Sequence, residues 1–373
     1  MLCLGNAAIS FNVAAVAAAI PVISKDLALS DLMVARIIPY YMIPYGIGAL
    51  LYAPLTRFLS YRKILILAMS VYVAMNFCAG LSKSLNNLLI AQVGAGIAAA
   101  SSSPLSLMII GELFEKNVRG RLIGIFFGTS FAASVVGMIF MGLVDWRWLF
   151  FIPAILGAIN IGCWSYLKTD LLDRRHEEAV NYIKVLFKNH IRDVFIFIFL
   201  SSFLYHSVQK WYGVFLSHEY GFGKETISLV LILAAMSGLA GQQIGGYLSD
   251  TKGRITACYI GLTGLGVGTI FLAGHYPLII LIFILALISI GWTICHNSIS
   301  TVLTDFPEED RPAIASLNSS VRFLSGGLGF SLSKFFVEKS FGLTFLGIGI
   351  LMLLLIYYVK TLIAQHTTGV KHA

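Results

Sequence analysis

Six residues inside long apolar segments carry side chains that could bind a polar solute. They form three pairs with a spacing of four, which places the two members of a pair on one face of a helix. The pairs are His206 with Lys210, Trp292 with His296, and Asn318 with Arg322. Ionisable groups within a membrane are costly and mark functional sites. We therefore predict that these six residues bind substrate.

The charges of this set indicate which solute it would bind. No carboxylate lies near the middle of the apolar segments, so Lys210 and Arg322 predict an electropositive cavity that favours an anionic or carboxylate-bearing solute. His206 and His296 are candidate proton carriers, because the ordinary pKa of histidine is about 6.5. Structural roles stay open: Arg322 could bond backbone carbonyls, Lys210 could extend toward the interface, and the aromatic residues could serve packing.

The elements that hold these residues must lie in lipid. The chain has 373 residues, of which 58% are hydrophobic and 12% are charged, and its mean hydropathy is +0.84. Soluble proteins carry roughly 25% charged residues. The net charge of +8 does not indicate a nucleic-acid partner, because the basic residues lie between the apolar runs.

Twelve apolar runs are long enough to span a bilayer as helices. We predict them at residues 1–22, 33–55, 64–82, 88–111, 122–144, 149–167, 194–217, 226–248, 255–274, 277–303, 313–335 and 342–363. The predicted fold class is an all-α membrane protein with 12 transmembrane helices in two pseudo-symmetric six-helix bundles.

Basic residues in the loops predict the orientation. With both termini cytoplasmic, 17 Lys and Arg residues fall on the inner side and 6 on the outer side. We therefore expect a multi-pass protein of the cytoplasmic (inner) membrane. No basic segment precedes the first apolar run, so a cleaved signal is not expected, and the natural start could lie upstream of Met1.

A polar stretch divides the chain into two parts. We predict an N-terminal six-helix bundle at 1–167, a cytoplasmic linker at 168–193 and a C-terminal six-helix bundle at 194–373. The linker is either an amphipathic helix on the inner membrane face or a plain connection. Similar loops recur in the two parts: Arg119 and Arg311 lie at matching places, 192 residues apart. Such internal repeats are typical of transporters.

A short loop motif follows the eighth apolar run. It has the pattern G-x-x-x-D-x-x-G-R, formed by Gly246, Asp250, Gly253 and Arg254. The glycines permit close approach of helix ends, and the aspartate can accept from a helix N-terminus or from the arginine. We predict a gating latch at the inner rim, with an ordinary topological loop as the alternative. The first-half copy, Ala53–Lys63, departs from the pattern at Ala53, Arg57 and Ser60.

These motifs together resemble those of the major facilitator superfamily, closest in pattern to its 12-helix drug-efflux-type members. Further resemblance lies in Asp145–Trp148 (DWRW) and in the R-x-x-S-G-x-x-G segment from Arg322 to Gly329. The resemblance implies two bundles that rock about a central cavity. Many members carry an arginine where this chain has Gln92, so proton antiport is not carried over from the family.

The leading hypothesis is a secondary transporter that moves a small organic solute by alternating access, with export slightly favoured. The expected partners are a small-molecule substrate, the lipid bilayer and, as an open question, a coupling proton. No nucleotide-binding or hydrolase motif occurs, and the five cysteines are interpreted as buried hydrophobes, so we expect no enzyme activity, cofactor or metal. A monomer is expected. The alternatives are an uptake permease, a sensor or scaffold that binds without flux, and a membrane-embedded enzyme acting on lipid.

Overall fold

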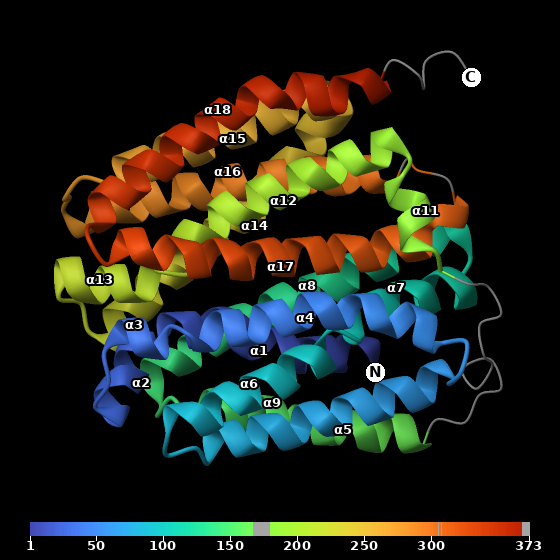
Figure 1. The fold of residues 1–373 in the computed structure, drawn as a ribbon, viewed down its shortest axis with the longest axis horizontal. Coiled ribbons are helices and arrows are strands. Elements are labelled where there is room, and N and C mark those ends of the chain that lie inside the picture. The colour runs from blue at the N-terminus through green and yellow to red at the C-terminus, as the bar shows by residue number, and fades with distance from the viewer. Residues whose placement is uncertain (167–179, 305, 307, 368–373) are drawn as a thin grey trace. The chain divides into compact units, whose positions relative to one another are not determined.

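A computed structural model describes residues 1–166, 180–304, 306 and 308–367 (Figure 1). Within these residues every regular element is a helix. The predicted linker residues 168–179 lie outside the described part of the chain. The all-helical fold class is confirmed.

The first part of the chain forms nine helices up to residue 166. They are α1 (Leu2–Ala18), α2 (Ile20–Leu27), α3 (Asp31–Val34), α4 (Ile37–Leu55), α5 (Tyr61–Gly80), α6 (Leu85–Ala99), α7 (Ser102–Leu113), α8 (Lys116–Leu143) and α9 (Trp148–Tyr166). The described residues after 179 form α11 (Tyr182–Leu186), α12 (Asn189–Gln209), α13 (Tyr212–Tyr220), α14 (Lys224–Thr251), α15 (Arg254–Phe271), α16 (Leu278–Thr304), the 3₁₀ turn η1 (Glu308–Asp310), α17 (Arg311–Val337) and α18 (Phe341–Thr367).

Ten helices or helix pairs in the described residues are long and apolar enough to cross a membrane, and the bent pair α1–α2 makes an eleventh. α17 is also of spanning length, with 27 residues, but it is more polar. These twelve segments correspond to the twelve predicted spans. The agreement follows from the bilayer, which fixes the length of an apolar run that must satisfy its own backbone hydrogen bonds.

Several predicted single spans are broken into two helices. α1 and α2 meet at an angle of 70°. Pro21 stands in the first turn of α2, and a proline has no N–H to continue the hydrogen bonds of the preceding helix. A break at Ala100–Ser101, with Pro104 just beyond it, separates α6 from α7. A third break, at Lys210 and Trp211, separates α12 from α13.

The contacts divide the chain into two compact units. Unit 1 comprises Met1–Asn181, Lys210–Ser228 and Ala315–Gly327. Unit 2 comprises Tyr182–Gln209, Leu229–Ile314 and Leu328–Ala373. In unit 1, α1 packs against α8 and α9, α4 packs against α6, and α5 contacts both α6 and α9. In unit 2, α15 lies between α16 and α18 (Figure 1). The division into six-helix bundles at 1–167 and 194–373, which was inferred from the sequence, stays a prediction.

Glycines permit the closest helix contacts within unit 1. A Cβ atom at Gly96 of α6 would overlap the carbonyl oxygen of Tyr41 in α4. A Cβ at Gly137 of α8 would likewise overlap the carbonyl oxygen of Phe11 in α1. Such small residues let backbones approach closely where no hydrophobic force drives helices together in lipid. The α4–α6 contact matters for function because it forms one wall of the cavity described below.

We predict that Gly96→Ala destabilises the protein by about 1–3 kcal/mol, the usual cost of overpacking. Gly128→Ala is the matched control, because no atom lies within 4 Å of the added Cβ. The control should be neutral or stabilise by about 0.5–1 kcal/mol, since alanine favours helix over glycine. Thermal unfolding of the purified protein in detergent measures both. Equal melting temperatures for the two variants would contradict the packing role of Gly96.

Candidate functional site

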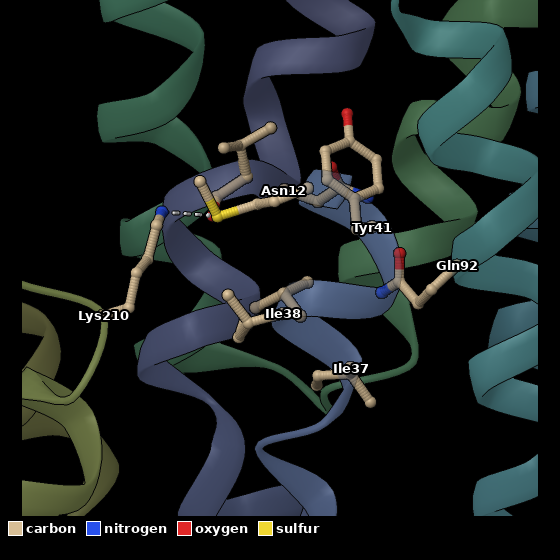
Figure 2. Close-up of a pocket in the computed structure, with 9 residues that line it drawn as sticks. Asn12, Ile37, Ile38, Tyr41, Gln92 and Lys210 are labelled. Atoms are coloured by element: carbon tan, nitrogen blue, oxygen red, sulfur yellow. Dashed lines mark hydrogen bonds between the residues drawn. The ribbon is translucent and has the colours of Figure 1, made fainter. Parts of the chain in front are cut away.

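A pocket with about 310 Å³ of empty space, open solvent included, lies within unit 1, between α1, α4, α6 and the residue that follows α12 (Figure 2). It is lined by Asn12, Val13, Val16, Ile37, Ile38, Tyr41, Met42, Gln92 and Lys210. Five of these nine side chains are apolar and four are polar. A cavity of mostly apolar lining with a few polar groups is typical of small-molecule sites.

Lys210 is the charged residue among those nine. Its side chain is buried, with the residue 5% exposed, and its Nζ donates to the carbonyl oxygen of Val13 at 3.3 Å. No carboxylate of the described residues pairs with it. An ammonium group removed from water without a counter-charge carries a penalty of several kcal/mol. A bound anion would offset that penalty.

Asn12 is held in place by a chain of hydrogen bonds that joins α1 to α5. Its Nδ2 donates to Asn76 Oδ1 at 3.0 Å, and Asn76 Nδ2 donates to the carbonyl oxygen of Tyr72 at 2.9 Å. The Tyr72 hydroxyl then donates to the carbonyl oxygen of Ala8 at 3.0 Å. All three side chains are buried. This network fixes the wall of the cavity and leaves Asn12 Oδ1 as an acceptor.

Tyr41 and Gln92 complete the polar lining. The Tyr41 hydroxyl is buried and has no hydrogen-bond partner among the described residues. Gln92 is 4% exposed, and its amide makes no hydrogen bond within the described part of the chain. Figure 2 shows Lys210 and Gln92 on opposite sides of the cavity, with Asn12 and Tyr41 between them. Buried polar groups are nearly always hydrogen-bonded, so these two side chains are available to a ligand.

The structure distributes the six predicted substrate-binding residues over three places. Lys210 lines the cavity. Arg322 Nε donates to Asn318 Oδ1 at 2.7 Å, so this pair shares a face of α17 as predicted from its spacing. The other three residues gather in unit 2, in a cluster that also contains a tyrosine.

This aromatic cluster consists of Tyr205, His206, Trp292 and His296. The rings of Tyr205 and Trp292 are stacked with centroids 3.9 Å apart. The Trp292 ring lies 5.9 Å from that of His206 and 5.6 Å from that of His296. Trp292 and His296 are thus neighbours on α16, as their spacing of four residues predicts.

The prediction that His206 and Lys210 share one helix face is wrong. α12 ends at Gln209, and Lys210 lies in the break before α13. The sequence also did not single out Tyr41 or Asn76. Both are polar residues in apolar runs, and this was the signal that could have identified them.

The predicted gating motif occupies the junction of α14 and α15. Gly253 precedes α15 with φ of 88° and ψ of 151°, a backbone conformation open almost only to glycine. The Asp250 carboxylate interacts electrostatically with Arg254. Gly246 lies beside Asn297, whose Nδ2 donates to the carbonyl oxygen of Gln242 at 2.9 Å. These contacts give the loop a defined shape, and its gating role stays a prediction.

The first-half copy of this motif has a different structure. Arg62 Nε donates to the carbonyl oxygen of Trp164 at 3.1 Å, and its Nη2 donates to that of Ser165 at 3.2 Å. Both carbonyls lie in the last turn of α9, where a cation compensates the partial negative charge of the helix end. Arg62 therefore joins α5 to the end of α9.

The DWRW segment, Asp145–Trp148, connects α2 to the start of α9 through side-chain contacts. Arg147 Nη2 forms an ion pair with Asp26 Oδ2 at 3.0 Å, and its guanidinium lies 4.4 Å from the ring centre of Trp146. Trp146 Nε1 donates to the same Asp26 oxygen at 3.3 Å. Trp146 is buried. These contacts explain the residue types of this segment by structure alone.

The described part of the predicted linker contains α11. Ile183 and Phe187 are exposed and Val185 is buried, a pattern compatible with the predicted amphipathic helix. Lys188 Nζ lies 2.5 Å from Asp310 Oδ2, and this hydrogen bond raises the pKa of Lys188. Because the lysine pKa is raised from an already alkaline value, the lysine is charged at neutral pH, and its contribution to stability is lost as the pH rises through the raised pKa. It ties the end of the linker to the start of α17.

The family model of the Major Facilitator Superfamily matches residues 2–330. This match covers most of the chain, which therefore belongs to the Major Facilitator Superfamily. The chain is thus a multi-pass membrane protein of a transporter family, and members of this family are not enzymes. The resemblance stated from the sequence motifs is confirmed.

Several relatives are named as multidrug or resistance proteins. The chain is 20% identical to "Multidrug transporter DTR1" of Candida glabrata, over 95% of this chain and 81% of that protein. It is 26% identical to "Multidrug resistance protein 3" of Bacillus subtilis, over 32% of this chain and 24% of the relative. With "Puromycin resistance protein pur8" of Streptomyces alboniger it shares 27% identity, over 39% and 30%. The last two matches thus span less than a third of the relatives' own length.

Solved structures with a similar fold include a D-xylose-proton symporter, with a TM-score of 0.78 and 16% identity over 96% of this chain and 95% of that one. A POT family transporter in complex with 5-aminolevulinic acid gives a TM-score of 0.79 and 13% identity, over 98% and 95%. At such low identities these neighbours establish the fold alone.

We predict that Gly253→Ala destabilises the protein by about 1–3 kcal/mol, because a Cβ is strained at this positive φ. Gly246→Ala in the same loop motif is the control, since its Cβ would meet only a side-chain nitrogen at 3.4 Å. Melting temperatures in detergent compare the two variants. If Gly253→Ala melts no lower than Gly246→Ala, the conformation of Gly253 is not a constraint on the fold.

Proposed function

We propose that this protein is a secondary transporter that moves a small organic anion, most simply a carboxylate, by alternating access, with export favoured over uptake. One observation carries the proposal: the buried ammonium of Lys210 faces a cavity whose lining holds no carboxylate. A cationic solute would meet like charge there, whereas an anion would offset the desolvation of the lysine.

The other predicted residues have supporting roles in the proposal. Arg322, oriented by Asn318, is the second candidate cation for the solute. The cluster of His206, Trp292 and His296 offers flat aromatic surfaces and two imidazole groups, a side chain that can carry a proton. If a proton is coupled to transport, these histidines are its candidate carriers. The motif from Gly246 to Arg254 is proposed to latch the cytoplasmic rim of the protein.

The hydrogen bond of Lys210 supports a way to couple binding to movement. Its acceptor, the Val13 carbonyl, belongs to α1, and Lys210 lies at the break before α13. A few residues further on, a Cβ at Gly213 would lie 2.6 Å from the carbonyl oxygen of Ala18 at the end of α1. A solute anion would compete with Val13 for the ammonium protons. Occupancy of the cavity would thereby loosen the contact between α1 and α13.

Export is favoured because the named relatives are resistance and multidrug proteins and because the DWRW segment resembles that of efflux-type members. We propose a monomer in the cytoplasmic membrane with both termini inside, on the distribution of basic residues. An uptake permease is the first alternative. A sensor that binds without flux is the second, motivated by Gln92 and by the altered first-half loop motif.

We predict saturable flux of organic anions in proteoliposomes containing the full chain, and a loss of at least about tenfold in Lys210→Met. Methionine keeps the length of the side chain but removes its charge, and a tenfold loss corresponds to about 1.4 kcal/mol. Lys339→Met is the matched control, because Lys339 is exposed at the end of α17, and it should transport normally. Uptake and counterflow of a panel of organic anions and cations, with an imposed pH gradient, provide the measurement.

Three outcomes would change the proposal. Flux of cations alone would overturn the charge argument. Specific binding with no flux would favour the sensor. Anion flux that ignores the pH gradient would leave the transporter in place and remove the histidines as coupling groups.

A further inference from the structure

We infer that the cavity selects a short monocarboxylate with a hydroxyl or primary amide at its far end, the carboxylate lying at Lys210 and the neutral group at Gln92 and Tyr41. This inference rests on the proposed function, since it specifies the solute of the same site. It goes further because it assigns a chemical task to each polar group of the lining and limits both charge and size.

The assignment of the ligand's carboxylate to Lys210 follows from the hydrogen-bond capacity of this side chain. Its ammonium has three N–H groups, of which one is given to the Val13 carbonyl, so two remain for a ligand. Lys210 is the sole cation among the nine lining residues. One positive charge compensates one carboxylate. A second carboxylate would be buried without a counter-charge, which is unfavourable.

The assignment of a neutral polar group to the other end of the ligand follows from two buried side chains that make no hydrogen bond within the described part of the chain. The Gln92 amide can donate twice and accept, and the Tyr41 hydroxyl can donate and accept. The Tyr41 hydroxyl has no hydrogen-bond partner among the described residues, and the Gln92 amide makes no hydrogen bond there. A hydrocarbon end would leave both buried and unpaired, which is costly, whereas a hydroxyl or amide satisfies them. A site of this type discriminates against the analogue that lacks the polar group.

The middle of the cavity indicates what kind of spacer joins the carboxylate of the ligand to its neutral polar end. Val16, Ile37, Ile38 and Met42 supply apolar surface, and Figure 2 shows Ile37 and Ile38 in the space between Lys210 and Gln92. These features fit a spacer of a few methylene groups.

Binding of matched acids to the purified full chain tests this inference. Isothermal titration would use ω-hydroxy acids of three to six carbons, the alkanoates of equal length and the corresponding dicarboxylates. We expect at least one hydroxy acid to bind at least about tenfold more tightly than its alkanoate, and more tightly than the dicarboxylate. Equal affinity of every hydroxy acid and its alkanoate overturns the inference, as does preferential binding of dicarboxylates.

Variants separate the two ends of the site. Gln92→Leu and Tyr41→Phe should reduce the preference for the hydroxyl while the alkanoate still binds, which also shows that the variants are folded. Gln243→Leu is the control, because Gln243 is exposed on α14 and outside the cavity, and it should keep the preference. Retention of the full preference in both Gln92→Leu and Tyr41→Phe contradicts the assigned neutral end.

The outcomes also separate this inference from the proposed function. If alkanoates and hydroxy acids bind and are transported equally well, the selectivity fails and the anion transporter stands. If no carboxylate binds or moves while a cation does, the proposed function itself fails.

Discussion

The buried ammonium of Lys210 is the constraint around which the candidate site is organised. Its partner in the protein is one backbone carbonyl, that of Val13. A charge in this position requires a polar cavity or a ligand, because hydrocarbon offers no other compensation. The break between α12 and α13 explains how the residue comes to be there. A lysine at the end of a helix can direct its side chain toward a neighbouring element, and here the neighbour is α1, close to its own break before α2.

The walls of the cavity differ in how firmly they are held. Asn12, Asn76 and Tyr72 form a connected, buried set of hydrogen bonds between α1 and α5. Gly96 brings α6 against α4 at backbone distance. Lys210, by contrast, has one hydrogen bond of 3.3 Å and lies outside regular helix. A rigid scaffold that carries neutral polar groups, opposite one cation on an interrupted segment, is an arrangement in which ligand binding can alter the contact of α13 with α1.

The sequence predicted the fold far better than the site, for physical reasons. Spans such as 64–82 and 149–167 could be predicted because lipid imposes both a length and an apolar composition on any helix that crosses it. Helix breaks were not predicted, although Pro21 and Pro104 were visible, and the break at Lys210 has no proline at all. That break made the assumed shared face of His206 and Lys210 wrong. Tyr41 was not selected because its role depends on having no partner, which only the packed structure reveals.

Gln92 shows how a neutral residue can define specificity within a shared fold. Many members of the superfamily have an arginine at the corresponding place, and a second cation there would face Lys210 across the cavity. Such a site would compensate two negative charges and would favour a dianion or an acidic partner within the protein. With glutamine, the same cavity has one cation at one end and a neutral donor and acceptor at the other. The charge of the solute is thus set by the identity of single side chains, while the helices that position them are common to transporters of many kinds.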